Sequence, residues 1–192
     1  MRSKPSIDRS STWKENFNRL TNVVETPSYK ITKTAIFIAF GSVLYVVESL
    51  LPGLAVLPGG KWGISNVILV IGIETFDLKM LLIIAISKSI LGSLLGGTFL
   101  SIPFLLGISG ACMSAVAMFS IYRIRFLNIS LIGISILGAW ISNLTQLLIV
   151  AILIVNSFNI IYYLPAITFM SILTGGVNGI VANYIKKLNH LF

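Results

Sequence analysis

The sequence predicts an all-α integral membrane protein, a bundle of six transmembrane helices with both termini in the cytoplasm. Three observations lead to this prediction. The 192 residues are 56% hydrophobic and only 10% charged, and a mean hydropathy of +0.95 is too high for a chain surrounded by water. The apolar residues form six stretches separated by turns or charges. All the basic residues except Lys61 and Lys88 lie in or beside segments that six crossings place on one side of the membrane.

The chain divides into a polar N-terminal tail, residues 1–29, and a transmembrane domain, residues 30–192. The tail mixes basic and acidic side chains, so we expect a cytoplasmic arm. The first apolar stretch begins late and is too long for the core of a cleavable signal. We therefore expect it to remain as a membrane anchor.

The six crossings have boundaries of differing clarity. The first is predicted over residues 34–51 and ends where Pro52 and Gly53 break the helix. The second, residues 62–73, is short for a full crossing and must be tilted or shielded by neighbouring helices. The remaining four crossings are predicted over residues 78–95, 103–122, 129–155 and 162–185.

A five-crossing alternative would omit the short second segment. It would place Lys79 and the basic residues that follow the fourth and sixth spans on the face of the membrane opposite to the basic N-terminal tail. Cytoplasmic loops carry an excess of Lys and Arg, so the charge distribution favours six crossings with both ends inside.

Polar side chains within the apolar stretches are the candidates for substrate binding, because an ionisable group in lipid is costly unless it is paired or hydrated. Asn143 and Gln146 are three residues apart and share one helix face, where they could bind a ligand or a neighbouring helix. Lys88 could instead form a buried ion pair with Glu48. The candidates of this kind, biased to the outer half of the membrane, are Glu48, Lys61, Asn66, Lys88, Asn143 and Gln146.

Two further sets of residues have an interfacial or a functional interpretation. Tyr162 and Tyr163 fall where an aromatic belt is expected, and they could also form the wall of a ligand site. Small residues four apart allow helices to approach closely. Ala35 and Ala39, near the cytoplasmic end of the first span, are the candidates for docking another subunit. Other series of this kind are Gly92 and Gly96; Ser135 and Ala139; and Ser171, Gly175 and Gly179.

Several chemistries lack the residues they need. A single histidine and a single cysteine provide neither a zinc site nor a Cys-His nucleophile, and no GxxxxGK[ST] phosphate loop occurs. The only aspartates, Asp8 and Asp77, cannot form the aspartate-rich magnesium motifs of prenyl synthases. We therefore expect no catalytic residue, metal or cofactor, and no enzyme. The basic charge follows from membrane topology, so we expect no nucleic-acid partner.

The order of these motifs resembles the Gx transporter family, which is also labelled heptaprenyl diphosphate synthase component I. The resemblance covers about residues 31–187. The segments that carry it are Glu48, Lys61-Trp62-Gly63-Ile64-Ser65-Asn66, Lys88, Asn143-Leu144-Thr145-Gln146, Tyr162-Tyr163-Leu164-Pro165 and Thr174-Gly175.

The resemblance implies a fold similar to the S components of energy-coupling factor transporters, in the plasma membrane of a bacterium. It implies a ligand pocket near the outer face, and docking through Ala35 and Ala39 on a coupling subunit that works with two ATPases. The expected function is a substrate-binding subunit for transport of a small, partly apolar molecule linked to isoprenoid or quinone metabolism. The alternative is a membrane scaffold that anchors a soluble prenyl diphosphate synthase through its cytoplasmic surface.

Overall fold

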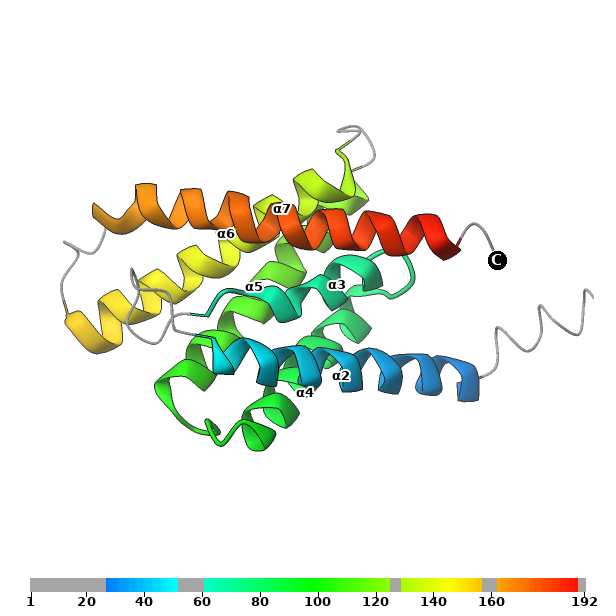
Figure 1. Cartoon of the computed structure of the whole chain (residues 1–192), viewed down its shortest axis with the longest axis horizontal. Helices are drawn as coiled ribbons and strands as arrows, with labels where there is room; N and C mark the ends of the chain where they lie inside the picture. The colour runs from blue at the N-terminus through cyan, green and yellow to red at the C-terminus, as the bar shows by residue number, and fades with distance from the viewer. Residues whose placement is uncertain (1–26, 52–60, 125–128, 157–161, 190–192) are drawn as a thin grey trace, which may run out of the picture. The chain divides into compact units, whose positions relative to one another are not determined.

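The computed structural model describes residues 27–51, 61–124, 129–156 and 162–189, and these residues are mostly helical (Figure 1). Most of the predicted tail, and residues 52–60 between the first and second predicted crossings, lie outside the described residues. The chain divides into a unit ending at Ile36 and a unit from Phe37 onward, and the contacts below lie within the second. The elements are α2 (Pro27–Leu50), the 3-10 turn η1 (Ile64–Asn66), α3 (Val67–Gly72), α4 (Leu78–Leu95), α5 (Ile102–Arg123), α6 (Leu131–Val150), the π-helical turn η3 (Ala151–Val155) and α7 (Leu164–Asn189).

Five helices are long and apolar enough to cross a membrane, which confirms the helical, multi-pass character of the chain. They are α2, α4, α5, α7 and the continuous helix over residues 131–153. Helix α4 begins and ends at the predicted residues, because Asp77 caps its start by accepting a hydrogen bond from the Met80 amide at 3.4 Å. Helix α2 begins earlier than predicted, at Pro27, since proline is tolerated in the first turn of a helix.

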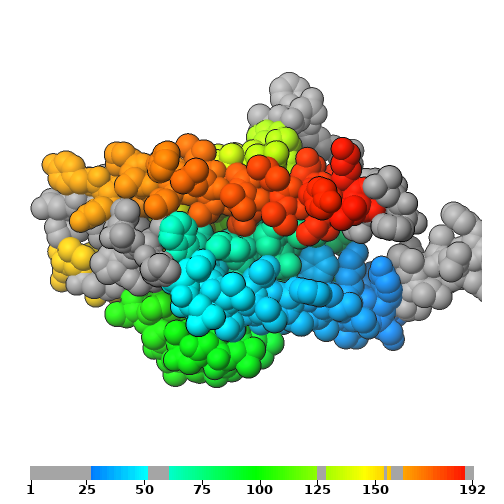
Figure 2. Space-filling model, viewed as in Figure 1, coloured from blue at the N-terminus to red at the C-terminus, as the bar shows by residue number. Residues whose placement is uncertain are grey.

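The second predicted crossing is helical but much shorter than the others. Together η1 and α3 rise roughly 15 Å, about half the thickness of a hydrocarbon core. Leu69 and Val70 are fully buried, as expected for a helix that is apolar on all sides. In Figures 1 and 2, α3 lies between α7 and the part of α2 after Phe37.

The η1–α3 segment runs antiparallel to residues 37–50 of α2. Gly63, the residue directly before η1, contacts Glu48 near the end of α2. At its other end, the ring of Phe76 packs edge-on against Phe37, with 5.0 Å between ring centroids. The stretch from Phe37 to Glu48 is roughly 16 Å long at 1.5 Å per residue, so the two segments cover the same depth.

Helices α6 and α7 approach each other closely along the predicted series of small residues. A β-carbon added to Gly175 would lie 2.6 Å from Ile136 Cα, and one added to Gly179 would lie 2.6 Å from Ile132 Cα. Both distances are well below the 3.5–4.0 Å of normal carbon contacts. The glycines of this series therefore pack one helix backbone on another within the chain.

A buried polar cluster as the candidate binding site

Glu48 holds the beginning of the short helical segment. Its side chain is only 3% exposed, and its carboxylate accepts hydrogen bonds from the amides of Gly63 and Ser65, the latter at 3.2 Å. Gly63 has a φ of 79°, a left-handed conformation that favours glycine. Its carbonyl accepts a hydrogen bond from Asn178 Nδ2 of α7 at 2.9 Å. The carboxylate thus satisfies amides at the start of a helical segment, where negative charge is favourable.

Lys88, on α4, binds the same turn. Its side chain is fully buried, and Nζ donates to Ser65 Oγ at 3.0 Å and to Asn66 Oδ1 at 2.8 Å. Glu48 and Lys88 do not form an ion pair with each other, since the only ion pair within the described part of the chain joins Lys186 and Glu74. Each charge is instead hydrogen-bonded to polar groups of the segment from Gly63 to Asn66.

The amides of α6 bind two different neighbours. Gln146 Oε1 accepts a hydrogen bond from the backbone amide of Lys61 at 3.0 Å. This bond joins the residues just before the η1–α3 segment to α6. Asn143 Nδ2 donates to Ser171 Oγ of α7 at 2.9 Å. Asn143 therefore makes the hydrogen bond to a neighbouring helix that the sequence left as an alternative to ligand binding.

Lys61 differs from the other polar groups because its ammonium lacks a hydrogen-bond acceptor. The residue is 8% exposed, and Nζ lies 3.1 Å from the centroid of the Tyr45 ring. Among the described residues, neither Lys61 Nζ nor the hydroxyls of Tyr45 and Thr98 have a hydrogen-bond partner, although all three atoms are buried. Buried polar groups of this kind are rare in native proteins and costly.

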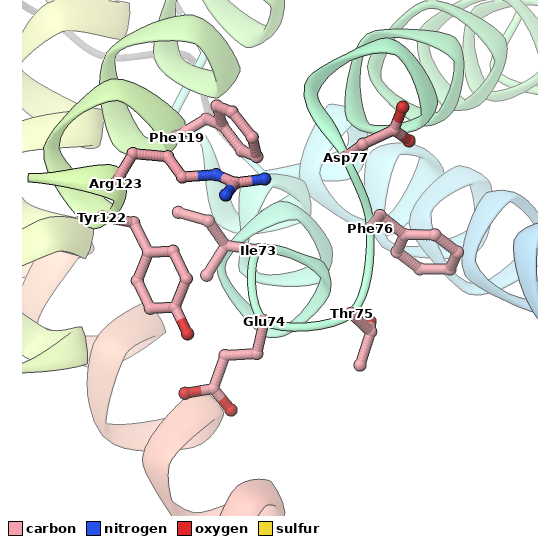
Figure 3. A pocket seen from close by; sticks show the side chains of 8 residues that line it. All are labelled: Ile73, Glu74, Thr75, Phe76, Asp77, Phe119, Tyr122 and Arg123. Atoms are coloured by element: carbon pink, nitrogen blue, oxygen red, sulfur yellow. The ribbon is translucent and has the colours of Figure 1, made fainter.

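A separate cavity of about 570 Å³ lies at the other end of the bundle (Figure 3). It is formed by the turn after α3 and the end of α5, where the Arg123 guanidinium lies 5.1 Å from the Phe119 ring centroid. Glu74, also in its wall, pairs with Lys186 of α7. No group of three His, Cys, Asp or Glu side chains suited to a metal occurs among the residues that the structure describes.

Residues 37–185 match a known family, the one described as heptaprenyl diphosphate synthase component I. The chain belongs to this family. The family region begins where the second structural unit begins and contains every residue of the polar cluster. This confirms the family predicted from the motifs. Comparisons with curated proteins and with solved structures found no significant match.

The family region brings most of the predicted site residues together, but not all of them. Glu48, Lys88 and Gln146 bind the segment that contains Lys61 and Asn66. Tyr162 and Tyr163 are 83% and 48% exposed just before α7, outside this set of contacts. Ala35 and Ala39 are exposed on α2. The roles predicted for these two pairs stay predictions.

Four residues of the site were not selected from the sequence, although three of them had a signal. Asn178 is an amide in an apolar span, the criterion that selected Asn143. Tyr45 lies one turn before Glu48 on the same helix face. Ser65 lies within the Lys61–Asn66 motif. Thr98 follows two glycines in a turn, and nothing in the sequence connects it with the other residues.

Proposed function

We propose that this chain is the substrate-binding membrane subunit of a bacterial uptake system for a small, partly apolar molecule linked to isoprenoid or quinone metabolism. The observation that carries the proposal is the buried Lys61 ammonium, which has no hydrogen-bond acceptor within a cluster whose other charges are satisfied. A buried ionisable group that has no hydrogen-bond acceptor in an apolar protein is a candidate for ligand binding.

The cluster residues that have hydrogen-bond partners would hold Lys61 in position. Glu48 and Gln146 bind backbone amides of the Lys61–Asn66 turn, and Lys88 binds two of its side chains. A binding group is effective when neighbouring hydrogen bonds hold it in place before the ligand arrives. In this proposal Lys61 binds the ligand, and the surrounding apolar helices provide the rest of the pocket.

The proposed topology has six crossings with both termini in the cytoplasm, as in the S components of energy-coupling factor transporters. Glu74 pairs with Lys186, and Glu74 and Arg123 share the wall of one cavity. The C-terminal ends of α3, α5 and α7 therefore lie together. A shared basic end agrees with the positive-inside rule. The half-length η1–α3 segment can serve as a crossing because neighbouring helices, and not lipid, surround it.

Transport would require partners, since the chain has no phosphate loop of its own. We propose a coupling subunit with two ATPases, docked through Ala35 and Ala39. Ala39 is exposed, and small residues at four-residue spacing allow a second helix to approach closely.

Affinity purification from membranes of the source bacterium, in mild detergent and followed by native mass spectrometry, tests this function. We expect a bound small molecule together with the coupling subunit and the ATPases. Ala39→Leu should reduce recovery of the partners, whereas Ser120→Leu, at an exposed position on α5, should not. Recovery of the chain without any small molecule, and with no ATPase, would contradict the proposal.

The second candidate is a membrane scaffold for a soluble prenyl diphosphate synthase. The family description names such a synthase, and the cavity beside Arg123 and Glu74 lies at the end that the proposed topology makes cytoplasmic. The same purification distinguishes the two functions, because a scaffold would recover a soluble synthase in place of the ATPases. Arg123→Ala should then reduce synthase recovery.

A further inference from the structure

We propose that the ligand carries an anionic oxygen group, a carboxylate or a phosphate, and that this group binds Lys61 Nζ together with the hydroxyls of Tyr45 and Thr98. This inference rests on the proposed substrate-binding function and identifies the chemical class of the substrate.

Three polar atoms without partners gather in one place. Lys61 Nζ lies over the Tyr45 ring, 3.1 Å from its centroid, and the Tyr45 hydroxyl and the Thr98 side chain are close enough to interact with each other. None of the three atoms has a hydrogen-bond partner of normal geometry. Tyr45 is 1% exposed and Lys61 is 8% exposed, so bulk solvent has little access to either side chain.

Two glycines make room for the Tyr45 and Lys61 side chains. A β-carbon on Gly92 of α4 would lie 2.6 Å from Tyr45 Cβ. A β-carbon on Gly107 of α5 would lie 3.2 Å from the Tyr45 hydroxyl and 3.3 Å from Lys61 Cδ. Both side chains therefore occupy space that any residue larger than glycine would fill.

Comparison with Lys88 shows what Lys61 lacks. Lys88 is fully buried and its ammonium donates to two side-chain oxygens, whereas the Lys61 ammonium has only the ring face of Tyr45. A ring face attracts a cation but accepts N–H bonds poorly compared with oxygen. The Glu48 carboxylate is already bound to the amides of Gly63 and Ser65. An acceptor for Lys61 must therefore come from outside the described chain.

An oxyanion has the chemistry that these three groups share. The ammonium and the two hydroxyls are all donors, and a carboxylate or a phosphate offers several acceptor oxygens with a compensating negative charge. A neutral carbonyl or hydroxyl would satisfy fewer of these donors and would bring no negative charge of its own to the buried ammonium.

A first experiment compares the two buried lysines in the absence of ligand. Lys61→Met and Lys88→Met are each exchanged into fresh detergent, and thermal unfolding is followed by circular dichroism. We expect Lys61→Met to be as stable as the wild type or more stable, because binding residues are often retained at the expense of stability. Lys88→Met should unfold at a lower temperature, since Ser65 and Asn66 lose their partner. Equal destabilisation by both substitutions would assign Lys61 a structural role and overturn the inference.

A second experiment compares three probes with one apolar chain and different head groups: farnesyl diphosphate, farnesoic acid and farnesol. We expect the anionic probes to bind about ten- to a hundredfold more tightly than farnesol, the usual range for hydrogen bonds to a charged group. Lys61→Met should abolish this preference, and Tyr45→Phe and Thr98→Val should reduce it. The control Lys79→Met removes an exposed positive charge and should leave it unchanged. The ratio of diphosphate to acid affinity separates a phosphate from a carboxylate.

The outcomes separate this inference from the proposed function. Farnesol binding as tightly as the anions, or a preference that survives Lys61→Met, would overturn the inference and leave a substrate-binding subunit. If no probe binds, the charge of the molecule that co-purifies with the wild type decides, and a neutral molecule would overturn it. Absence of any bound molecule would overturn the function as well.

Discussion

Substitution of Gly175 by alanine tests the close approach of α6 and α7. A β-carbon at this position would lie 2.6 Å from Ile136 Cα and 2.9 Å from the Ser135 carbonyl oxygen. The neighbouring Gly176 provides a matched control, because a β-carbon there has nothing within 4 Å. Both substitutions are in the same turn of α7 and give the same gain in helix propensity.

The expected magnitude follows from these distances. Normal carbon contacts are 3.5–4.0 Å, so the two helices must separate by about 1 Å to accept the new methyl group. Overpacking of this kind costs about 1–3 kcal/mol. Because the propensity gain cancels between the two variants, Gly175→Ala should be less stable than Gly176→Ala by that amount. For a chain of this size the difference corresponds to roughly 2–12 °C in Tm.

Thermal unfolding in one mild detergent, followed by circular dichroism for both variants and the wild type, measures this difference. Titration with SDS gives an independent ranking. If Gly175→Ala is as stable as Gly176→Ala, the two backbones do not approach as closely as described, and the small-residue series has no role in helix packing.

Three further predictions concern the contacts of the polar segments. Gly63→Ala should lower the free energy of unfolding by about 1–2 kcal/mol, since a φ of 79° is unfavourable for alanine. Chemical denaturation measures this loss, and an unchanged free energy would mean that the turn adopts another conformation. Asn143→Ala and Ser171→Ala, combined in a double-mutant cycle, should give a coupling energy of about 0.6–2 kcal/mol for the interhelical hydrogen bond. If the two changes in the free energy of unfolding simply add, the bond is excluded. Lys186→Ala should lower the free energy of unfolding by less than about 1 kcal/mol, because the ion pair of Lys186 with Glu74 is partly exposed. The loss should shrink further in high salt. A larger loss that does not depend on salt would indicate a buried pair.

Local features of the sequence were enough to predict the class of protein and most helix boundaries. Lipid requires long apolar stretches, and breaks in those stretches mark the ends of helices regardless of how the helices pack. Helix α4 is predicted to the residue because Asp77 before it and glycines after it are local signals. The short η1–α3 segment was predicted less well, since nothing in its composition shows whether lipid or protein surrounds it.

The sequence by itself determined which side chains are costly in a membrane, because the cost of a charge in hydrocarbon depends on the residue type and not on the fold. Glu48, Lys61 and Lys88 are all identified in this way. Only the tertiary structure decided which of them have partners. The insertion of the Lys61–Asn66 turn between α2, α4 and α6 provides amides to Glu48 and side-chain oxygens to Lys88, but no acceptor to Lys61. These contacts join residues far apart in the chain, so no local pattern can predict them.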